Sequence, residues 1–232
     1  MSKAKNKIDE KDILEFFKYS YFGDLNISIE VASNRAYRDM CRTLNFDILP
    51  KKDKDTTISN LKEDFNFIFR EKISIINEGI ITSQREFDTW HHGLCDNIIK
   101  KSKKIEKFKK TDNDKKEKIQ LTYGQAQKWV NMTIKYLYIL NDHTFDNVFD
   151  FLHIPVDNYI FKAVKEKLGI DVPTNAWSRW DNYKEYEDYQ KAIRKKLKEK
   201  IREKIYTDTP PLRWEFKTWL EKAQEEKIGD KK

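Results

Sequence analysis

The feature that most constrains this chain is an apolar repeat with helical spacing, which recurs along the sequence and is bounded by capping residues. Two capping boxes open such segments: Ser83 with Glu86, and Thr122 with Gln125. In a capping box the two side chains satisfy backbone N–H groups that the first helical turn leaves unpaired. The sequence holds only 6 Gly and 5 Pro, too few for the turns that a β-sandwich needs about every 8–12 residues. We therefore predict an all-α fold.

We expect one compact domain, residues 1–232, built from about eight helices. The apolar spacing and the capping residues place helices at approximately 9–22, 28–44, 57–78, 83–105, 122–140, 145–152, 157–168, 183–206 and 212–227. Residues 51–55 are expected to form a charged loop. The Lys-rich stretch 106–118, centred on Asp112 and Asp114, is also expected to be a loop, and a sub-boundary of the domain would fall there.

The two cysteines, Cys41 and Cys95, limit the covalent chemistry that we expect. They form no CxxC pair, so neither a disulfide framework nor a structural zinc site is predicted. The sequence also lacks a glycine-rich phosphate loop, G-x-S-x-G and H-E-x-x-H, and we expect no cofactor and no metal. No apolar run approaches the roughly 20 residues that cross a bilayer, and the charged N-terminus lacks a signal-peptide pattern. We expect a cytoplasmic protein without a membrane partner.

Positive charge is concentrated in two tracts of the sequence. The net charge is +7, but residues 100–118 alone carry +6 and residues 191–204 another +6, which leaves −5 for the rest. Clustered Lys and Arg attract phosphate, so the tracts indicate a nucleic acid, RNA or DNA, as partner. The alternative interpretation is a solubilising linker and an exposed helix face. The residues predicted to contact nucleic acid are Lys100, Lys101, Lys103, Lys104, Lys107, Arg194, Lys195, Lys198 and Arg202.

The segment 121–140 combines an apolar face with many polar side chains. Lys128, Asn131 and Lys135 recur on one helix face, and Gln127 lies one turn before Asn131. A helix this apolar should be largely buried, and buried polar groups need hydrogen-bond partners. The segment therefore predicts either an interior network that fixes the packing or a site that presents amide and ammonium donors to an anionic ligand.

The same segment resembles a set of uncharacterised microbial all-α proteins. The shared pattern is Q-K-x-x-N-x-x-x-K-Y, then H-x-P-x-D, then a later Trp with downstream Tyr, and here it spans about 121–220. The family has no established reaction, so the resemblance implies a helical unit and leaves the activity open. It also implies that six residues form one constellation: Gln127, Lys128, Asn131, Lys135, His153 and Asp157.

Pro155 separates His153 from Asp157 and disfavours helix in the residue before it. We therefore expect Asp157 to cap the helix that follows, with His153 held just outside it. His153 would then serve either as a structural hydrogen-bonding group or as an acid or base near neutral pH.

Arg85, followed by His91 and His92, resembles the R-x(4–6)-H spacing of HEPN ribonucleases. In that family the Arg and His lie near a helix start and act on RNA phosphodiester bonds. The resemblance implies that Arg85 stabilises the phosphate while His91 or His92 moves the proton. This chain departs from the family in two ways: Glu86 follows the Arg where a smaller polar residue is usual, and the motif lies mid-chain.

These patterns support three interpretations of function. The first is a helical protein that engages nucleic acid, acting in conflict between microbes and phages. The second is an interaction or regulatory scaffold without catalysis, which binds a protein partner or forms a homodimer; a large exposed aromatic patch around 177–180 or 214–219 would favour it. The third is a HEPN-like, metal-independent ribonuclease. Whether the protein is an enzyme is left open by the sequence.

Overall fold

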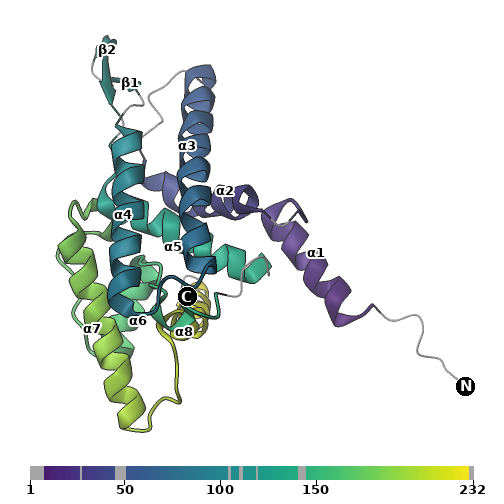
Figure 1. Ribbon diagram of the computed structural model, residues 1–232, viewed down its shortest axis with the longest axis vertical. Coiled ribbons are helices and arrows are strands. Elements are labelled where there is room, and N and C mark those ends of the chain that lie inside the picture. The colour runs from purple at the N-terminus through teal and green to yellow at the C-terminus, as the bar shows by residue number, and fades with distance from the viewer. Residues whose placement is uncertain are drawn as a thin grey trace, which may run out of the picture.

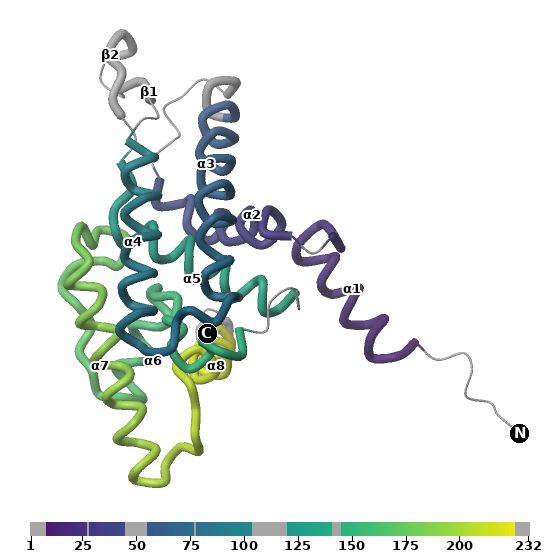
Figure 2. Tube along the Cα trace, viewed as in Figure 1, coloured from purple at the N-terminus to yellow at the C-terminus, as the bar shows by residue number. Residues whose placement is uncertain are grey.

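The computed structural model describes residues 8–26, 28–44, 51–103, 106–109, 112–118, 120–140 and 145–229 (Figure 2). Within these ranges the chain forms eight α-helices, three 3-10 helices and one antiparallel hairpin (Figure 1). The α-helices are α1 (Glu10–Phe22), α2 (Ile29–Met40), α3 (Lys51–Asn77), α4 (Gln84–Ser102), α5 (Tyr123–Leu140), α6 (Asn158–Leu168), α7 (Tyr183–Arg202) and α8 (Pro211–Gly229). The shorter elements are η1 (Cys41–Thr43), η2 (Phe149–Phe151), η3 (Trp177–Arg179), β1 (Glu106–Lys109) and β2 (Asp112–Lys118). The predicted all-α fold with about eight helices is confirmed.

Three predicted elements differ in the structure. The loop predicted at 51–55 is wrong, because α3 already begins at Lys51; no glycine or proline lies between there and the end of α3 to stop the helix. The loop predicted at 106–118 is also wrong, because β1 and β2 pair with Glu106 opposite Lys118, a register that sets opposite charges in facing positions. The helix predicted at 145–152 shrinks to η2, since Phe145 has a φ of 56°, which an α-helix does not accommodate.

The predicted capping residues fix the ends of the helices that carry the site. Ser83 and Glu86 form the capping box that opens α4. Thr122 accepts from the Gln125 N–H at 3.1 Å, and the Gln125 side chain accepts from the Thr122 N–H at 3.0 Å, which opens α5. Asp157 caps α6 by accepting from the backbone N–H of Ile160. These local contacts determine at which residue each helix begins, and the position of the functional side chains along the helix follows from that.

Helix α5 forms the centre of the domain, and nearly all of its residues are buried, polar ones included. Helices α2 and α4 pack against it, and η3 contacts its N-terminal end. Trp129 stacks on Phe65 of α3 with ring centroids 3.9 Å apart, and its indole N–H donates to the Ser33 carbonyl at 3.1 Å. The other helices are therefore arranged around α5, and its polar side chains lie in the interior.

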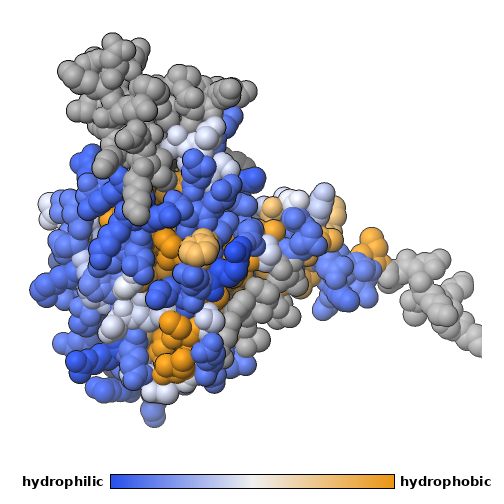
Figure 3. All heavy atoms as spheres, turned by 45° about the horizontal axis from the view of Figure 1, so that its top comes forward, coloured by the Kyte–Doolittle hydropathy of each residue, from blue (hydrophilic) through white to orange (hydrophobic). Residues whose placement is uncertain are grey.

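Helix α1 extends from the rest of the domain and contacts it at its C-terminal end (Figure 1). Phe22 is buried, the Tyr21 hydroxyl lies 2.9 Å from that of Tyr136, and Lys18 Nζ donates to the Leu140 carbonyl. Hydrophobic side chains show on α1 in Figure 3, beside a mostly hydrophilic body. None of the described helices is long and apolar enough to span a membrane.

Candidate functional site

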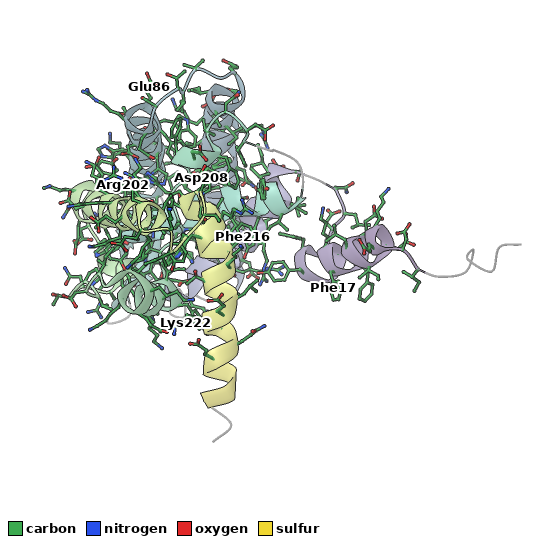
Figure 4. The ribbon with its side chains drawn as sticks, turned by 90° about the horizontal axis from the view of Figure 1, so that it is seen from below. Phe17, Glu86, Arg202, Asp208, Phe216 and Lys222 are labelled. Atoms are coloured by element: carbon green, nitrogen blue, oxygen red, sulfur yellow. The ribbon has the colours of Figure 1, made fainter. Side chains whose placement is uncertain are left out.

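A groove of about 740 Å³ runs between α4 and α7. Six cationic side chains and three carboxylates lie on its walls. The lining residues are Gln84, Arg85, Asp88, Thr89, His92, Tyr183, Glu187, Lys191, Arg194, Lys195, Lys198, Glu199 and Arg202. Glu86, near the start of α4, and Arg202, at the end of α7, lie on the same side of the molecule in Figure 4. The groove therefore joins the Arg–His motif of α4 with the second basic tract of the sequence.

Helix α4 places Arg85 and His92 on one face, because seven residues make about two helical turns. Both side chains line the groove. The His92 ring stacks on Tyr183 with centroids 4.0 Å apart and planes 6° apart, and His92 Nε2 lies 3.5 Å from the Asp96 carboxylate. Since the His92 side chain is 40% exposed, it is held in place by Tyr183 and is still accessible to a ligand.

Helix α7 contributes most of the positive charge of the groove. Its groove face carries Lys191, Arg194, Lys195, Lys198 and Arg202. Lys191 pairs with Glu187 at 2.8 Å, and Arg194 pairs with Asp88 at 3.2 Å. Within the described part of the chain, Lys195, Lys198 and Arg202 form no salt bridge. Three cations of the groove are therefore available to an anionic partner.

A continuous chain of hydrogen bonds leads from the core to the floor of the groove. Asn131 Nδ2 donates to the Tyr186 hydroxyl at 2.9 Å, and that hydroxyl donates to His153 Nδ1 at 2.8 Å. His153 Nε2 donates to Asp88 Oδ1 at 2.7 Å, and Arg194 donates to Asp88 Oδ2 at 3.2 Å. Since Asp88 and Arg194 line the groove, the buried network orients two charged groups at its floor.

Burial and hydrogen bonding set the ionisation of this network. Burial would raise the pKa of Asp88, but the hydrogen bond from His153 and the charge of Arg194 outweigh it and lower the pKa to about 2. Burial lowers the pKa of His153, although its hydrogen bond to Asp88 opposes this. Burial also lowers the pKa of His91 well below its ordinary value, and the nearby His153 lowers it further. At neutral pH the network therefore contains a charged Asp88–Arg194 pair and two neutral histidines.

The two candidate catalytic histidines lie in different environments. His91 is fully buried, and its Nε2 donates to Asn131 Oδ1 at 3.0 Å. His92 lines the groove with Arg85. Consecutive residues point in directions about 100° apart around a helix, so only one of the two can face the groove. The geometry therefore pairs Arg85 with His92 and places His91 in the structural network.

The prediction of one constellation from Gln127 to Asp157 requires correction, because α5 distributes those residues between two neighbouring groups. Gln127 and Asn131 join His153 in the network behind the groove, with Asn131 donating to Gln127 at 3.0 Å. Lys128, Lys135 and Asp157 instead line a separate cavity of about 710 Å³ between α5 and α8. Lys128 pairs there with Asp157 at 2.8 Å and Lys135 with Glu215 at 2.7 Å. Adjacent faces of α5 meet different helices, which separates the two groups.

The first basic tract lies at the other end of α4 from the groove. Lys100 is in the last turn of α4, Lys103 follows that helix, and Lys101 pairs with Asp64 of α3 at 3.0 Å. Fifteen residues of helix separate Lys100 from Arg85, a distance of roughly 22 Å along the axis. Lys107 belongs to β1. Lys104 lies outside the described residues. Among the described residues, the first basic tract therefore begins about 22 Å from the groove that the second tract lines.

The residues that the structure describes hold no metal-binding cluster: no group of three or more His, Cys, Asp or Glu among them is arranged to hold a metal ion. Both cysteines are free thiols; Cys95 is buried, with Sγ 3.8 Å from His91 Nδ1, and burial raises its pKa. Neither Cys95 nor Cys41 lines the groove.

Several groups of both sites carry no signal in the linear sequence. Glu215 on α8 approaches Lys135 across 80 residues of chain, whereas Tyr186, which joins the network from α7, is one of the Tyr residues downstream of the Trp in the resemblance pattern. Arg35 of α2 lines the second cavity. Only helix packing brings such distant positions together, so local spacing could not reveal them. Comparisons of the chain with protein-family models, with curated proteins and with solved structures found no match.

Proposed function

We propose that this protein binds nucleic acid through the α4–α7 groove. The observation that carries the proposal is the convergence of two separate sequence signals in one groove: Arg85 and His92 from α4, and the basic face of α7. Six cations line the groove against three carboxylates, and two of those carboxylates already pair with Lys191 and Arg194. A polyanion is the class of partner that this excess of positive charge favours.

The groove also offers a surface on which a base can stack. The stacked rings of His92, from α4, and Tyr183, from α7, line the groove together with its cations. Proteins that bind single strands without sequence preference combine a basic groove with aromatic rings in this way. The network behind the groove holds Asp88 and Arg194 in place, so the ligand meets a preorganised surface.

The proposal is tested by binding of labelled single- and double-stranded RNA and DNA over a salt series. The groove variant replaces the exposed Lys195, Lys198 and Arg202 by Ala, and it should fold because none of them is buried. Each lost phosphate contact reduces the slope of log K against log salt by about 0.7–0.9. We expect a slope shallower by about 2 and affinity reduced at least tenfold.

A matched control replaces three lysines outside the groove, Lys11, Lys165 and Lys217, which are also exposed. This variant has the same net charge as the groove variant. Equal weakening by both would mean that net charge alone drives binding. Wild-type protein that binds none of the four nucleic acids at low salt would refute the proposal.

A second candidate function is cleavage of RNA in the same groove, and the position of Arg85 and His92 on one face of α4 supports it. His92 would take the proton of a ribose 2′-hydroxyl, whose oxygen attacks the adjacent phosphorus. The P–O5′ bond breaks, leaving a 2′,3′-cyclic phosphate, and the departing 5′-oxygen takes a proton from water to become a 5′-hydroxyl, while Arg85 stabilises the charge on the phosphate. The protonated His92 returns its proton to solvent.

Cleavage is measured on gels of the same RNA samples. If the reaction occurs, His92→Ala and Arg85→Ala should each reduce its rate by at least 100-fold. DNA, which lacks the 2′-hydroxyl, should be bound without being cut. RNA cleavage that both substitutions leave unchanged would assign the activity to another group or to a contaminant.

The interaction alternative is supported by a different surface, the outer face of α1. Trp177, Trp180 and Trp214 are buried and Trp219 is half-buried, so no large exposed aromatic patch lies at 177–180 or 214–219. On α1, however, six apolar side chains are between 44% and 67% exposed, and five of them lie toward one face: Ile13, Leu14, Phe16, Phe17 and Tyr21. An amphipathic helix of this length gains most of its stability by packing its apolar face.

We propose that a second copy of this chain covers that face. At about 200 Å² for each large side chain, the exposed face amounts to about 500 Å² per protomer. Two copies would bury about 1,000 Å², the lower limit for a specific interface. The helix carries two lysines and three acidic residues, so two antiparallel copies would not repel each other strongly.

Sedimentation velocity at micromolar concentration tests the homodimer. The wild type should sediment as a dimer and the variant Phe16→Glu with Phe17→Glu as a monomer. The control Lys11→Glu, which makes the same change in charge at an exposed position outside the apolar face, should remain dimeric. A monomeric wild type would refute self-association through α1.

The cytoplasmic location and the role in microbe–phage conflict stay predictions. Plaque counts on bacteria that express the wild type or the groove variant measure the role in microbe–phage conflict directly. We expect the groove variant to lose any protection that the wild type gives.

A further inference from the structure

The cavity between α5 and α8 is distinct from the groove, because no residue lines both. Its volume of about 710 Å³ lies within the range of about 300–1,000 Å³ that is usual for small-molecule sites. Side chains from α1, α2, α5, η3 and α8 form its walls. Binding of nucleic acid in the α4–α7 groove does not involve this cavity.

Two buried ammonium groups form one wall of the cavity. Lys128 and Lys135 lie seven residues apart on the same face of α5, with side chains only 5% and 9% exposed. Each pairs with a carboxylate from another element, Asp157 before α6 and Glu215 on α8. Buried ion pairs often stabilise a fold no better than apolar residues of the same shape. Two of them on one cavity wall therefore suggest a role in binding.

The hydrogen-bonding groups around the cavity have more donors than acceptors. Asp157 accepts from Lys128 and from the Ile160 N–H, and both oxygens of Glu215 accept from Lys135. The Lys128 ammonium has three N–H donors and donates to one described group, Asp157. Asp157 and Glu215 are thus satisfied by the protein, whereas two of the three N–H donors of Lys128 have no partner among the described residues.

Arg35 of α2 adds further donors at the same cavity. Its guanidinium lies 3.7 Å from Asp39, beyond hydrogen-bond distance, and 3.9 Å above the Tyr21 ring. The Asp39 carboxylate accepts instead from the Tyr136 hydroxyl. Among the described residues, Arg35 Nε is buried and has no hydrogen-bond partner. The side chain as a whole is 24% exposed and lines the cavity, so a ligand with acceptor oxygens would meet the guanidinium there.

Aromatic rings form much of the remaining wall. Trp177 and Trp219 line the cavity, together with Phe216, whose ring lies 4.5 Å from Lys135 Nζ. Flat rings of this kind bind flat ligands by stacking. The cavity therefore combines surfaces for a planar ring with donors for an anion.

We propose that this cavity binds a nucleoside monophosphate, with the base against Trp177 and Trp219 and the phosphate near Lys128 and Arg35. A phosphate provides acceptor oxygens for the N–H groups of Lys128 and Arg35, and a nucleobase provides the planar ring. The ligand is either a free nucleotide or the 5′-terminal nucleotide of an oligonucleotide, since both have this chemistry. The proposal does not depend on the groove between α4 and α7.

Isothermal titration calorimetry of the full chain with AMP, GMP, CMP and UMP tests the proposal. Adenosine and inorganic phosphate are the two half-ligands, and each should bind at least 100-fold more weakly than the best nucleotide. A 5′-phosphorylated trinucleotide that binds as tightly as the mononucleotide identifies the strand terminus as the source. A trinucleotide that binds at least tenfold more weakly identifies the free nucleotide.

Two variants test the contacts of the phosphate and of the base. Arg35→Gln and Trp219→Leu should each weaken nucleotide binding at least tenfold. Arg38→Gln is the matched control, because Arg38 is exposed on the same helix and lies outside the cavity; it should bind as the wild type does.

A double variant, Lys128→Met with Asp157→Asn, separates a binding role from a structural one. It replaces the buried pair beside the proposed phosphate position with neutral residues of similar size, and Asn can still cap α6. It should therefore melt near the wild-type temperature and still lose at least tenfold in affinity. Full nucleotide affinity in this variant would overturn the proposal. So would adenosine binding as tightly as AMP, or no heat from any nucleotide at millimolar concentration.

Discussion

Replacing Asp88 by Asn should remove the central charge of the buried network and leave its shape almost unchanged. The Asp88 side chain is 9% exposed and accepts from His153, Arg194 and Gln84. Asn can still accept the hydrogen bond from His153, so the substitution chiefly removes the negative charge opposite Arg194. In size and charge the Asn side chain resembles that of protonated Asp88.

The expected loss follows from the pKa of Asp88, which falls from an ordinary 3.8 to about 2. Since each pKa unit corresponds to about 1.4 kcal/mol, the ionised carboxylate contributes about 2.5 kcal/mol to the free energy of unfolding at neutral pH. An acid with a lowered pKa stabilises the fold above its ordinary pKa and loses that contribution as pH falls through the folded value. The window is therefore approximately pH 4 to pH 2.

Urea unfolding of the wild type and Asp88→Asn at pH 7, 5 and 3 measures this contribution. At pH 7 the variant should be less stable by about 2.5 kcal/mol, and by pH 3 the difference should narrow by about 1 kcal/mol because the wild type begins to lose its charge. Asp96→Asn, a half-exposed carboxylate beside His92, should change stability by less than about 0.5 kcal/mol. A difference between wild type and Asp88→Asn that stays constant from pH 7 to pH 3 would refute the reasoning.

Three further predictions concern the histidines, the glycines and a helix cap. Burial lowers the pKa of His91 and His153, so both stay neutral in the fold while the unfolded chain takes up protons below about pH 6.5. Stability measured by urea unfolding should therefore fall by up to about 1.4 kcal/mol per pH unit for each histidine between pH 6.5 and pH 5, and a flat profile would contradict their burial as neutral groups. Gly124→Ala should cost several kcal/mol or prevent folding, because a Cβ would lie 1.7 Å from the Trp177 carbonyl oxygen; Gly93→Ala, with nothing within 4 Å of its Cβ, should instead stabilise α4 by about 0.5–1 kcal/mol. Thermal melts compare the two variants, and equal effects on the melting temperature would contradict the close approach of the Trp177 carbonyl oxygen to Gly124. Ser83→Ala should remove the α4 cap and cost about 1 kcal/mol in the same assay, whereas an unchanged melting temperature would show that Glu86 alone holds the helix start.

Much of the fold could be predicted because helix limits depend on residues close in sequence. Ser83 with Glu86, Thr122 with Gln125, and Asp157 each begin a helix where the sequence places it. Where prediction failed, the local signal was weak. The charged residues at 51–55 are compatible with either loop or helix, and the pairing of β1 with β2 depends on strand contacts rather than on an apolar pattern.

The candidate sites were only partly predictable, because side-chain direction is a tertiary property. The basic spacing of α7 was visible in the sequence, as were Arg85 and His92. That Arg194 reaches Asp88, 106 residues earlier in the chain, was not.

The sequence by itself determined most of the helices, the capped starts of α4, α5 and α6, and which helix faces are apolar or basic. Those properties arise from interactions within about four residues along the chain. Only the tertiary structure decided that α4 meets α7 at a basic groove, that His91 is buried while His92 is accessible, and that Lys135 meets Glu215 across 80 residues. Such choices depend on how all the helices pack around α5 at once, and no local pattern contains that information.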